Sequence, residues 1–140
     1  DNFIQIAKHL YETNPQTNIV LAGKRREYII SKLKKEKIPF NYFEMVNFKE
    51  LNELYNILDL YIVASRVEGG PAAILECAAS KTPIISTDVG LVSDILHPNS
   101  IYNMDNFKKA RPNVYEAYNN SIKYHIPNGF EKFNNFFQSL

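Results

Sequence analysis

The sequence has few cysteines, little net charge and no long apolar run. Cys77 is the only cysteine among 140 residues, which excludes an internal disulfide and offers no cysteine spacing for a metal site. The formal net charge is +1, with 16 basic against 15 acidic residues, so nothing in the charge favours a nucleic-acid partner. Because no run reaches membrane-spanning length and the first residues do not resemble a signal peptide, we expect a cytoplasmic location or the periphery of a membrane.

The composition is typical of a globular protein. Hydrophobic residues make up 45% of the chain and aromatic residues 13%, which is enough to build a folded core. A helical pattern begins at once, with Ile4, Ala7 and Leu10, and stops at Asn14 and Pro15. A chain that opens directly on a helix is expected to be a piece of a longer protein, and any membrane contact would be made through that full-length protein.

Short apolar runs alternate with helical patterns along most of the chain. The runs typical of buried strands cover residues 18–23, 40–46, 59–65, 82–87 and 100–104. Helical patterns lie between them, over residues 25–36, 48–58, 71–80 and 89–96. Strands and helices that alternate in this way predict an α/β fold, in which helices cover both faces of a parallel sheet.

The last part of the chain departs from this alternation. Residues 103–113 are polar and predict a loop, and two further helices lie on either side of Pro127. The expected division is a domain of residues 1–112 followed by C-terminal helices in residues 113–140. The final helix carries an apolar stripe formed by Phe130, Phe133, Phe137 and Leu140. This stripe is expected to pack on the chain's own sheet or, alternatively, on an N-terminal domain missing from the sequence.

The stretch SRVEGGPAAILECAAS follows the third expected strand. In open parallel sheets, ligands bind beyond the carboxyl ends of the strands. Gly69 and Gly70 permit close approach of a ligand to the backbone, and Pro71 suits the first position of a helix. The amides of Gly70, Ala72 and Ala73 would then be available at the positive end of the helix dipole, which predicts an anion site.

Two glutamates bracket this glycine turn. At about 1.5 Å per residue, Glu76 lies about 8 Å from the helix start, the distance from a nucleotide's phosphates to its ribose hydroxyls. A carboxylate can accept hydrogen bonds from such a diol, and Glu68 would face whatever is attached beyond the phosphates. The plainer alternative is a strand-to-helix turn with two surface charges. Against it, Glu76 lies in an otherwise apolar segment, where burying an idle carboxylate would be costly.

Residues 53–90, ELYNILDLYIVASRVEGGPAAILECAASKTPIISTDVG, resemble the nucleotide-binding half of retaining GT-B glycosyltransferases of the GT4-like group. The hallmark of that family is a pair of glutamates separated by seven residues, here Glu68 and Glu76. The pair lies between an apolar strand that ends in serine and a strand and turn like PIISTDVG. Looser agreement extends over residues 1–96. The resemblance implies the Rossmann-like C-terminal half of a GT-B fold.

The resemblance also implies an activity and roles for individual residues. A hexosyltransferase-like enzyme would move a sugar from a nucleoside diphosphate sugar to an acceptor, with retention of configuration at the anomeric carbon. UDP-sugar is the favoured donor, and no metal ion or cofactor would be needed. Glu76 would bind the ribose hydroxyls, and Glu68 would contact the donor sugar and help to stabilise positive charge at its reacting carbon. The amides at Gly69 and Gly70 would hold the diphosphate or the sugar, and the base would rest near Val46.

The sequence departs from the family pattern at three places. It begins after the segment in which family members carry an Arg and a Lys for the diphosphate. Lys24-Arg25-Arg26 replaces a glycine-rich loop, and Lys24 and Arg25 are therefore candidates to bind the phosphates. Alternatively, they are only surface charges at a helix start, where basic charge opposes the helix dipole. Leu91 replaces a second glycine after DVG. The acceptor-binding half is missing, so this chain alone is expected to bind a nucleotide weakly and to catalyse nothing.

Two other functions compete with this interpretation. A non-catalytic nucleotide-sugar-binding module would keep Glu76 and the helix start but could dispense with Glu68. An acceptor domain upstream of the sequence would favour the enzyme. A dinucleotide oxidoreductase, with residues 24–26 binding an adenosine phosphate, is disfavoured because no Gly-x-Gly-x-x-Gly follows a strand.

Overall fold

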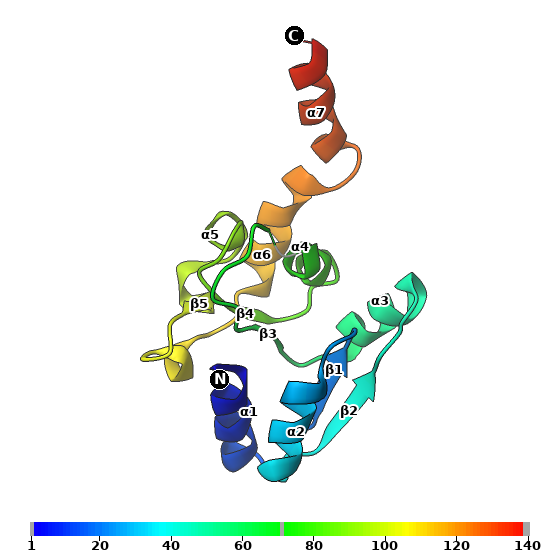
Figure 1. The fold of residues 1–140 in the computed structure, drawn as a ribbon. Helices are drawn as coiled ribbons and strands as arrows, with labels where there is room; N and C mark the ends of the chain where they lie inside the picture. Colours follow the sequence, from blue (N-terminus) through cyan, green and yellow to red (C-terminus); the bar gives the residue numbers. More distant parts are fainter. Residues whose placement is uncertain (1, 71, 139–140) are drawn as a thin grey trace. The chain divides into compact units, whose positions relative to one another are not determined.

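The chain forms two compact units, each with its own parallel sheet (Figure 1). The computed structural model describes residues 2–70 and 72–138. The first unit is Asp1–Leu54 and the second is Tyr55–Leu140. The α/β class and the parallel direction of the paired strands are confirmed. In the described part of the chain, however, hydrogen bonds join the strands into a two-stranded and a three-stranded sheet, whereas one sheet was expected.

The first unit packs two helices and a two-stranded sheet around one apolar core. Its elements are α1 (Asn2–Thr13), β1 (Ile19–Ala22), α2 (Glu27–Lys35), β2 (Phe40–Phe43) and most of α3 (Phe48–Ile57). The register pairs Ile19 with Phe40 and Ala22 with Phe43. The buried core residues are Ile4, Ala7, Ile19, Leu21, Leu33 and Ile38. Residues from α1, β1 and α2 therefore meet in the same core, as their periodicity predicted.

A reciprocal pair of polar contacts fixes the start of α3. The backbone N–H of Asn47 donates to Glu50 Oε2 at 2.8 Å, and the N–H of Glu50 donates to Asn47 Oδ1 at 3.0 Å. This capping box satisfies two amides that the helix itself leaves without partners. The helix therefore begins directly after the loop that follows β2.

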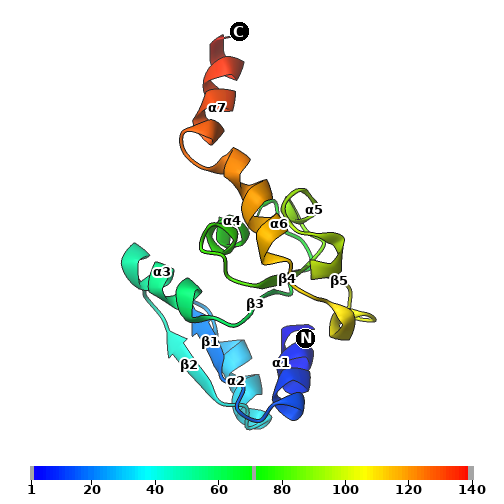
Figure 2. The ribbon, with the colours of Figure 1, turned by 180° about the vertical axis from the view of Figure 1, so that it is seen from behind.

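The second unit contains the other three strands. Its elements are β3 (Tyr61–Val63), α4 (Ala72–Ala79), β4 (Ile84–Thr87), α5 (Val92–Ile95), β5 (Ile101–Tyr102), α6 (Val114–Ser121) and α7 (Asn128–Gln138), with 3-10 turns η1 (Pro98–Ser100), η2 (Phe107–Lys109) and η3 (Ile122–Tyr124). The strand order is β3-β4-β5. Helix α4 contacts β4 and α6, and α6 also contacts α5 (Figure 2). Ile74, Ile84 and Val92 are among the buried residues of this unit.

The C-terminal helices differ in what they contact. Helix α6 packs on α4 and α5, and α7 contacts η3. On α7, Phe130 is 65% exposed, while the other members of the expected apolar stripe lie outside the described side chains. The division of the sequence at residue 112 and the surface on which the stripe packs stay predictions. No helix in the described ranges is long and apolar enough to cross a membrane.

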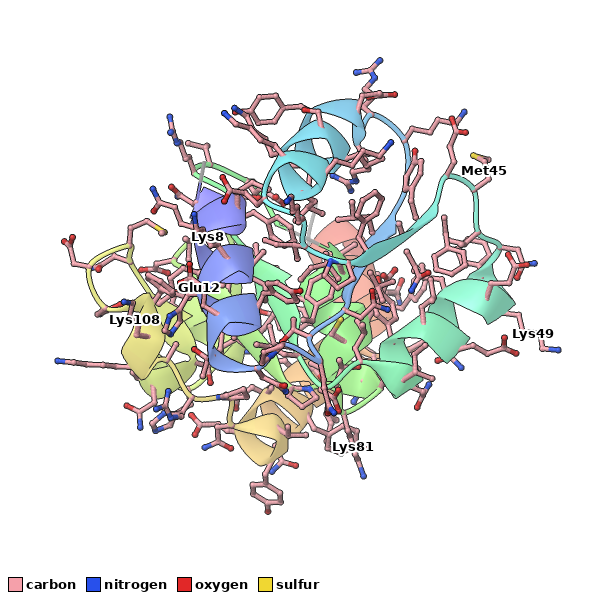
Figure 3. The ribbon with its side chains drawn as sticks, turned by 90° about the horizontal axis from the view of Figure 1, so that it is seen from below. Lys8, Glu12, Met45, Lys49, Lys81 and Lys108 are labelled. Atoms are coloured by element: carbon pink, nitrogen blue, oxygen red, sulfur yellow. The ribbon has the colours of Figure 1, made fainter. Side chains whose placement is uncertain are left out.

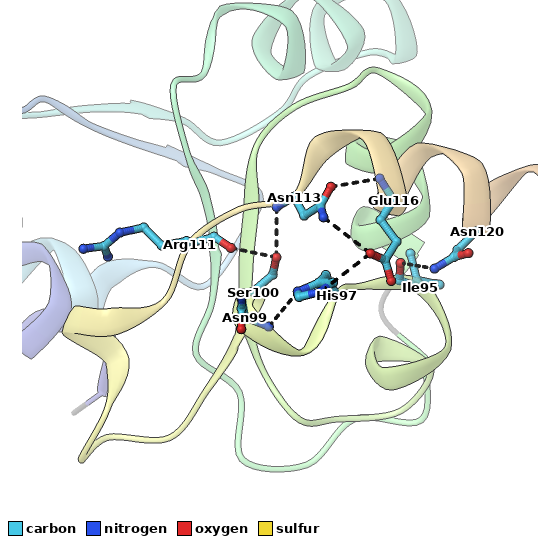
Figure 4. A network of polar contacts seen from close by, with 8 residues as sticks. All are labelled: Ile95, His97, Asn99, Ser100, Arg111, Asn113, Glu116 and Asn120. Carbon is cyan, nitrogen blue, oxygen red and sulfur yellow. Dashed lines mark hydrogen bonds and ion pairs between the residues drawn. The ribbon is translucent and has the colours of Figure 1, made fainter.

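A buried serine ties α6 to the turn before β5 (Figure 4). Ser100 is 1% exposed. Its Oγ donates to the Arg111 carbonyl and accepts from the Asn113 N–H, each at 3.0 Å. Asn113 in turn caps α6, because its Oδ1 accepts from the Glu116 N–H at 3.1 Å. The hydroxyl of Ser100 thus holds the chain that leads into α6.

Replacing Ser100 with alanine should lower the free energy of unfolding by about 1 to 3 kcal/mol, because the part-buried Arg111 carbonyl and Asn113 N–H both lose the Ser100 hydroxyl as a partner. Urea unfolding of Ser100→Ala measures this effect. Ser93→Ala, at an exposed position of α5, is the matched control. Equal unfolding midpoints for the two variants would show that the network does not hold α6.

Candidate functional site

The loop between β3 and α4 is open to solvent. Strand β3 ends at Val63 and α4 begins at Ala72, within the helix predicted for residues 71–80. Residues 66–70 are all exposed, and so is Ala72. Pro71, expected at the first helical position, lies outside the described residues. Solvent, and with it a soluble ligand, therefore reaches the glycine turn and the beginning of α4.

Backbone atoms of the loop after β4 touch this glycine turn. Because β3 and β4 are parallel, with Val63 opposite Ser86, the loops that follow them leave the same edge of the sheet. Gly90 has φ +55°, and a Cβ atom on it would lie 2.9 Å from the Gly70 nitrogen. A Cβ on Gly69 would meet nothing within 4 Å. Position 90 therefore needs glycine for both its conformation and its contact, whereas position 69 has room.

Leu91 lies beside the same turn. A Cβ atom on Gly70 would be 3.8 Å from Leu91 Cδ1, which is ordinary van der Waals contact. Leu91 thus places an apolar side chain against the glycine turn, at the position where a second glycine was expected from the family pattern.

Glu68 is held by a hydroxyl at the end of β3. The Oγ of Ser65 donates to Glu68 Oε1, and Thr87 Oγ1 donates to the Ser65 carbonyl at 2.7 Å. Glu68 itself is exposed. A chain of hydrogen bonds therefore runs from β4 through Ser65 to this carboxylate, which still faces solvent.

Glu76 is held by a buried tyrosine. The Tyr55 hydroxyl donates to Glu76 Oε2 at 2.7 Å, and Tyr55 is only 8% exposed. Burial, and then the hydrogen bond to Glu76, raise the pKa of the Tyr55 phenol, so it stays a neutral donor at physiological pH. One oxygen of the Glu76 carboxylate thus has a fixed donor.

The expectation that Glu76 is buried is wrong. Glu76 is exposed, as are Ala72 and Ala79, while Ile74 and Cys77 are buried. The three exposed residues recur at helical spacing, so they share the outer face of α4. The segment looks apolar all round only because alanines fill its exposed face. The energetic cost of burying a carboxylate is therefore no argument that Glu76 has a function.

The predicted basic residues follow β1 in the first unit. Arg26 Nε donates to the Ala22 carbonyl at 3.1 Å. Lys24 and Arg25 are exposed, and neither forms an ion pair with a described residue. Arg25 has φ +62°, a backbone conformation that favours glycine. The charged groups of Lys24 and Arg25 thus have no ion-pair partner among residues 2–70 and 72–138, while Arg26 is already bonded to the backbone.

Val46, the residue expected near the nucleotide base, also belongs to the first unit. It is half-buried and directly precedes Asn47, the cap of α3. The neighbouring Met45 is 71% exposed, and its side chain extends from the loop between β2 and α3 (Figure 3). A common site for Val46, Lys24 and Arg25 with the glycine turn and glutamates of the second unit stays a prediction.

The hydroxyl donors that hold the two glutamates, Ser65 and Tyr55, were not predicted from the sequence. Ser65 lies three residues before Glu68, and this short spacing could have suggested the contact. Tyr55 lies 21 positions before Glu76, and the residue pattern gave no sign that the two side chains meet.

Comparison with known proteins links both units to one family. The family model described as glycosyl transferases group 1 matches residues 1–126. The match therefore includes the loop after β1, the glycine turn and both glutamates. No curated protein matches the chain significantly.

Replacing Gly90 with alanine should lower the free energy of unfolding by about 2 kcal/mol or more, because alanine is strained at positive φ and its Cβ would overlap the Gly70 backbone. Gly69→Ala is the matched control, since that position has space for a methyl group. Chemical denaturation of both variants measures the difference. If both unfolded at the same denaturant concentration, the contact between the two loops would not constrain the turn.

Proposed function

The chain belongs to the glycosyl transferases group 1 family, and on this premise we propose that it is the donor-binding half of a retaining, GT4-like enzyme. Its substrate is a nucleoside diphosphate sugar, with UDP-sugar the favoured donor. The acceptor-binding half lies elsewhere in the full-length protein, and the present chain alone binds the donor weakly and does not catalyse transfer.

The observation that carries this proposal is the exposed glycine turn at the start of α4, with a hydroxyl-bonded carboxylate on each side. The first amides of α4 and the positive end of its dipole attract a diphosphate. Gly90 holds the turn from one side through backbone contact. Glu76, further along the exposed face of α4, accepts hydrogen bonds from the ribose diol, and Glu68 faces the sugar.

The proposed chemistry uses these groups at the reacting bond. The bond between the anomeric carbon and the diphosphate oxygen breaks, and the diphosphate leaves with the electron pair. The acceptor oxygen then bonds to the anomeric carbon on the same face, and its proton passes to the departing diphosphate oxygen. Negative charge on Glu68 stabilises the positive charge that develops on the sugar, while the α4 dipole stabilises the leaving diphosphate.

Lys24 and Arg25 are proposed to bind the diphosphate as well. Arg25 keeps a left-handed backbone conformation at a cost of about 1 kcal/mol or more relative to glycine. A retained strain of this kind is consistent with a side chain that is needed for a ligand. Both basic residues are exposed after β1, at the carboxyl end of a parallel strand.

The two glutamates should differ in what they control. In the intact protein, Glu76→Ala should weaken nucleoside diphosphate binding by about 10- to 100-fold, because hydrogen bonds to a charged group are lost. Glu68→Ala should keep most of that affinity but lower kcat by about a hundredfold or more. Calorimetry with UDP, GDP and ADP measures binding, and release of the diphosphate measures transfer.

Unchanged affinity in Glu76→Ala would remove the ribose role. An intact protein that binds nucleotide sugars but transfers no sugar would instead favour the non-catalytic binding module.

Replacing Arg25 with glycine should separate stability from binding. Relief of backbone strain and the greater freedom of unfolded glycine nearly cancel, so the free energy of unfolding should change by less than about 1 kcal/mol. Nucleoside diphosphate affinity should fall about tenfold, because a charge-assisted contact is lost.

Lys37→Gly is the matched control, since Lys37 is also exposed, basic and at φ +56°. If both variants kept full affinity, Arg25 would not be part of the donor site.

A further inference from the structure

Tyr55 is fixed by contacts on three sides. Its ring stacks edge-on against Tyr61, with centroids 5.9 Å apart and planes at 80°. Its backbone carbonyl accepts from Thr82 Oγ1 at 2.8 Å, and its hydroxyl donates to Glu76 Oε2 at 2.7 Å. Both Tyr55 and Thr82 are buried, at 8% and 3% exposure. Such a side chain has little freedom to change rotamer.

Hydrogen bonds connect Tyr55 to α4 at two points, through Thr82 and through Glu76. The N–H of Thr82 donates to the Cys77 carbonyl at 2.9 Å, which ties Thr82 to the last turn of α4. Thr82 bonds to the Tyr55 backbone, and the Tyr55 hydroxyl returns to Glu76, one residue before Cys77. The phenol is therefore held at a set position relative to the backbone that carries Glu76.

The fixed Tyr55 hydroxyl limits the conformations of the Glu76 side chain. A free glutamate on a helix surface samples several rotamers, and ordering it on binding lowers affinity. The hydrogen bond from the Tyr55 hydroxyl favours those Glu76 rotamers that place Oε2 2.7 Å from the phenol oxygen. Glu76 remains an exposed residue in this arrangement. The carboxylate is thereby oriented before a ligand arrives.

We propose that Tyr55 is a positioning residue for donor binding, which holds the Glu76 carboxylate ready to accept the ribose diol of a nucleoside diphosphate. This inference rests on the proposed function, in which Glu76 binds that diol. Tyr55 does not touch the ligand, and its whole effect on affinity passes through Glu76.

The test is a double-mutant cycle in the intact protein with UDP, GDP and ADP as probes. Tyr55→Phe keeps the ring and its stacking on Tyr61 but removes the donor. It should weaken nucleoside diphosphate binding about two- to tenfold, the range expected for ordering one long side chain. The effect should raise KM more than it lowers kcat. In the Glu76→Ala background, Tyr55→Phe should change affinity no further.

Tyr102→Phe is the matched control for loss of a buried phenol. Tyr102 is 3% exposed, and its hydroxyl donates to the Val63 carbonyl at 2.8 Å. This variant should lose similar stability in thermal unfolding while it keeps nucleotide affinity. A parallel loss of affinity in Tyr102→Phe would show that loss of stability explains the result for Tyr55, and would overturn the inference.

Two other outcomes would overturn it. The first is full affinity in Tyr55→Phe although Glu76→Ala weakens binding. The second is an equal loss of affinity on Tyr55→Phe with and without Glu76. Unchanged affinity in Glu76→Ala itself is distinguishable, because it would overturn the proposed function first.

A crystal structure of the wild-type protein with nucleotide gives a second test that needs no folded variant. We expect the Tyr55 hydroxyl still on Oε2 and a ribose hydroxyl on the same carboxylate. A carboxylate that had turned away from Tyr55 to reach the ligand would contradict the proposal.

Discussion

The site of the second unit depends on the parallel pairing of β3 with β4. Because both strands end at the same edge, the loops that follow them meet, and Gly90 approaches Gly70 to a distance that leaves no room for a side chain. The same edge brings Thr87 to the Ser65 carbonyl and Ser65 to Glu68. One pairing thus places the glycine turn, the start of α4 and one of the two carboxylates.

The two glutamates combine exposure with a fixed hydrogen-bond donor. Each is exposed to solvent, yet each accepts from a hydroxyl: Glu68 from Ser65 and Glu76 from Tyr55. A neutral hydroxyl donor orients a carboxylate and leaves its negative charge in place. A lysine or arginine partner would instead neutralise that charge. The carboxylates therefore remain available to polyol hydroxyls and to a developing positive charge.

Much of the fold follows from local patterns in the sequence. The five strands were predictable from short apolar runs, and the start of α4 from the glycines before it. The division of the strands into two sheets was not, because hydrogen bonding between strands depends on long-range packing that periodicity does not report. The exposure of Glu76 was misjudged for a related reason, since alanine suits both a buried and an exposed helix face.

An exposed glycine turn between β3 and α4 was predictable from the sequence, whereas the ligand roles of Glu68 and Glu76 stay predictions. The Tyr55 hydroxyl was not predictable, because the contact joins α3 to α4 across 21 positions. The resemblance led us to expect a glycine at position 91 and a glycine-rich loop at residues 24–26. At position 25 the backbone still has the conformation that favours glycine, at φ +62°.

Hydrogen–deuterium exchange of the intact protein, with and without saturating UDP, GDP or ADP, tests most directly whether the start of α4 binds the donor. The account predicts slower amide exchange in residues 68–77 and in the adjoining loop at residues 88–91. Saturating nucleotide that left exchange in both segments unchanged would contradict it.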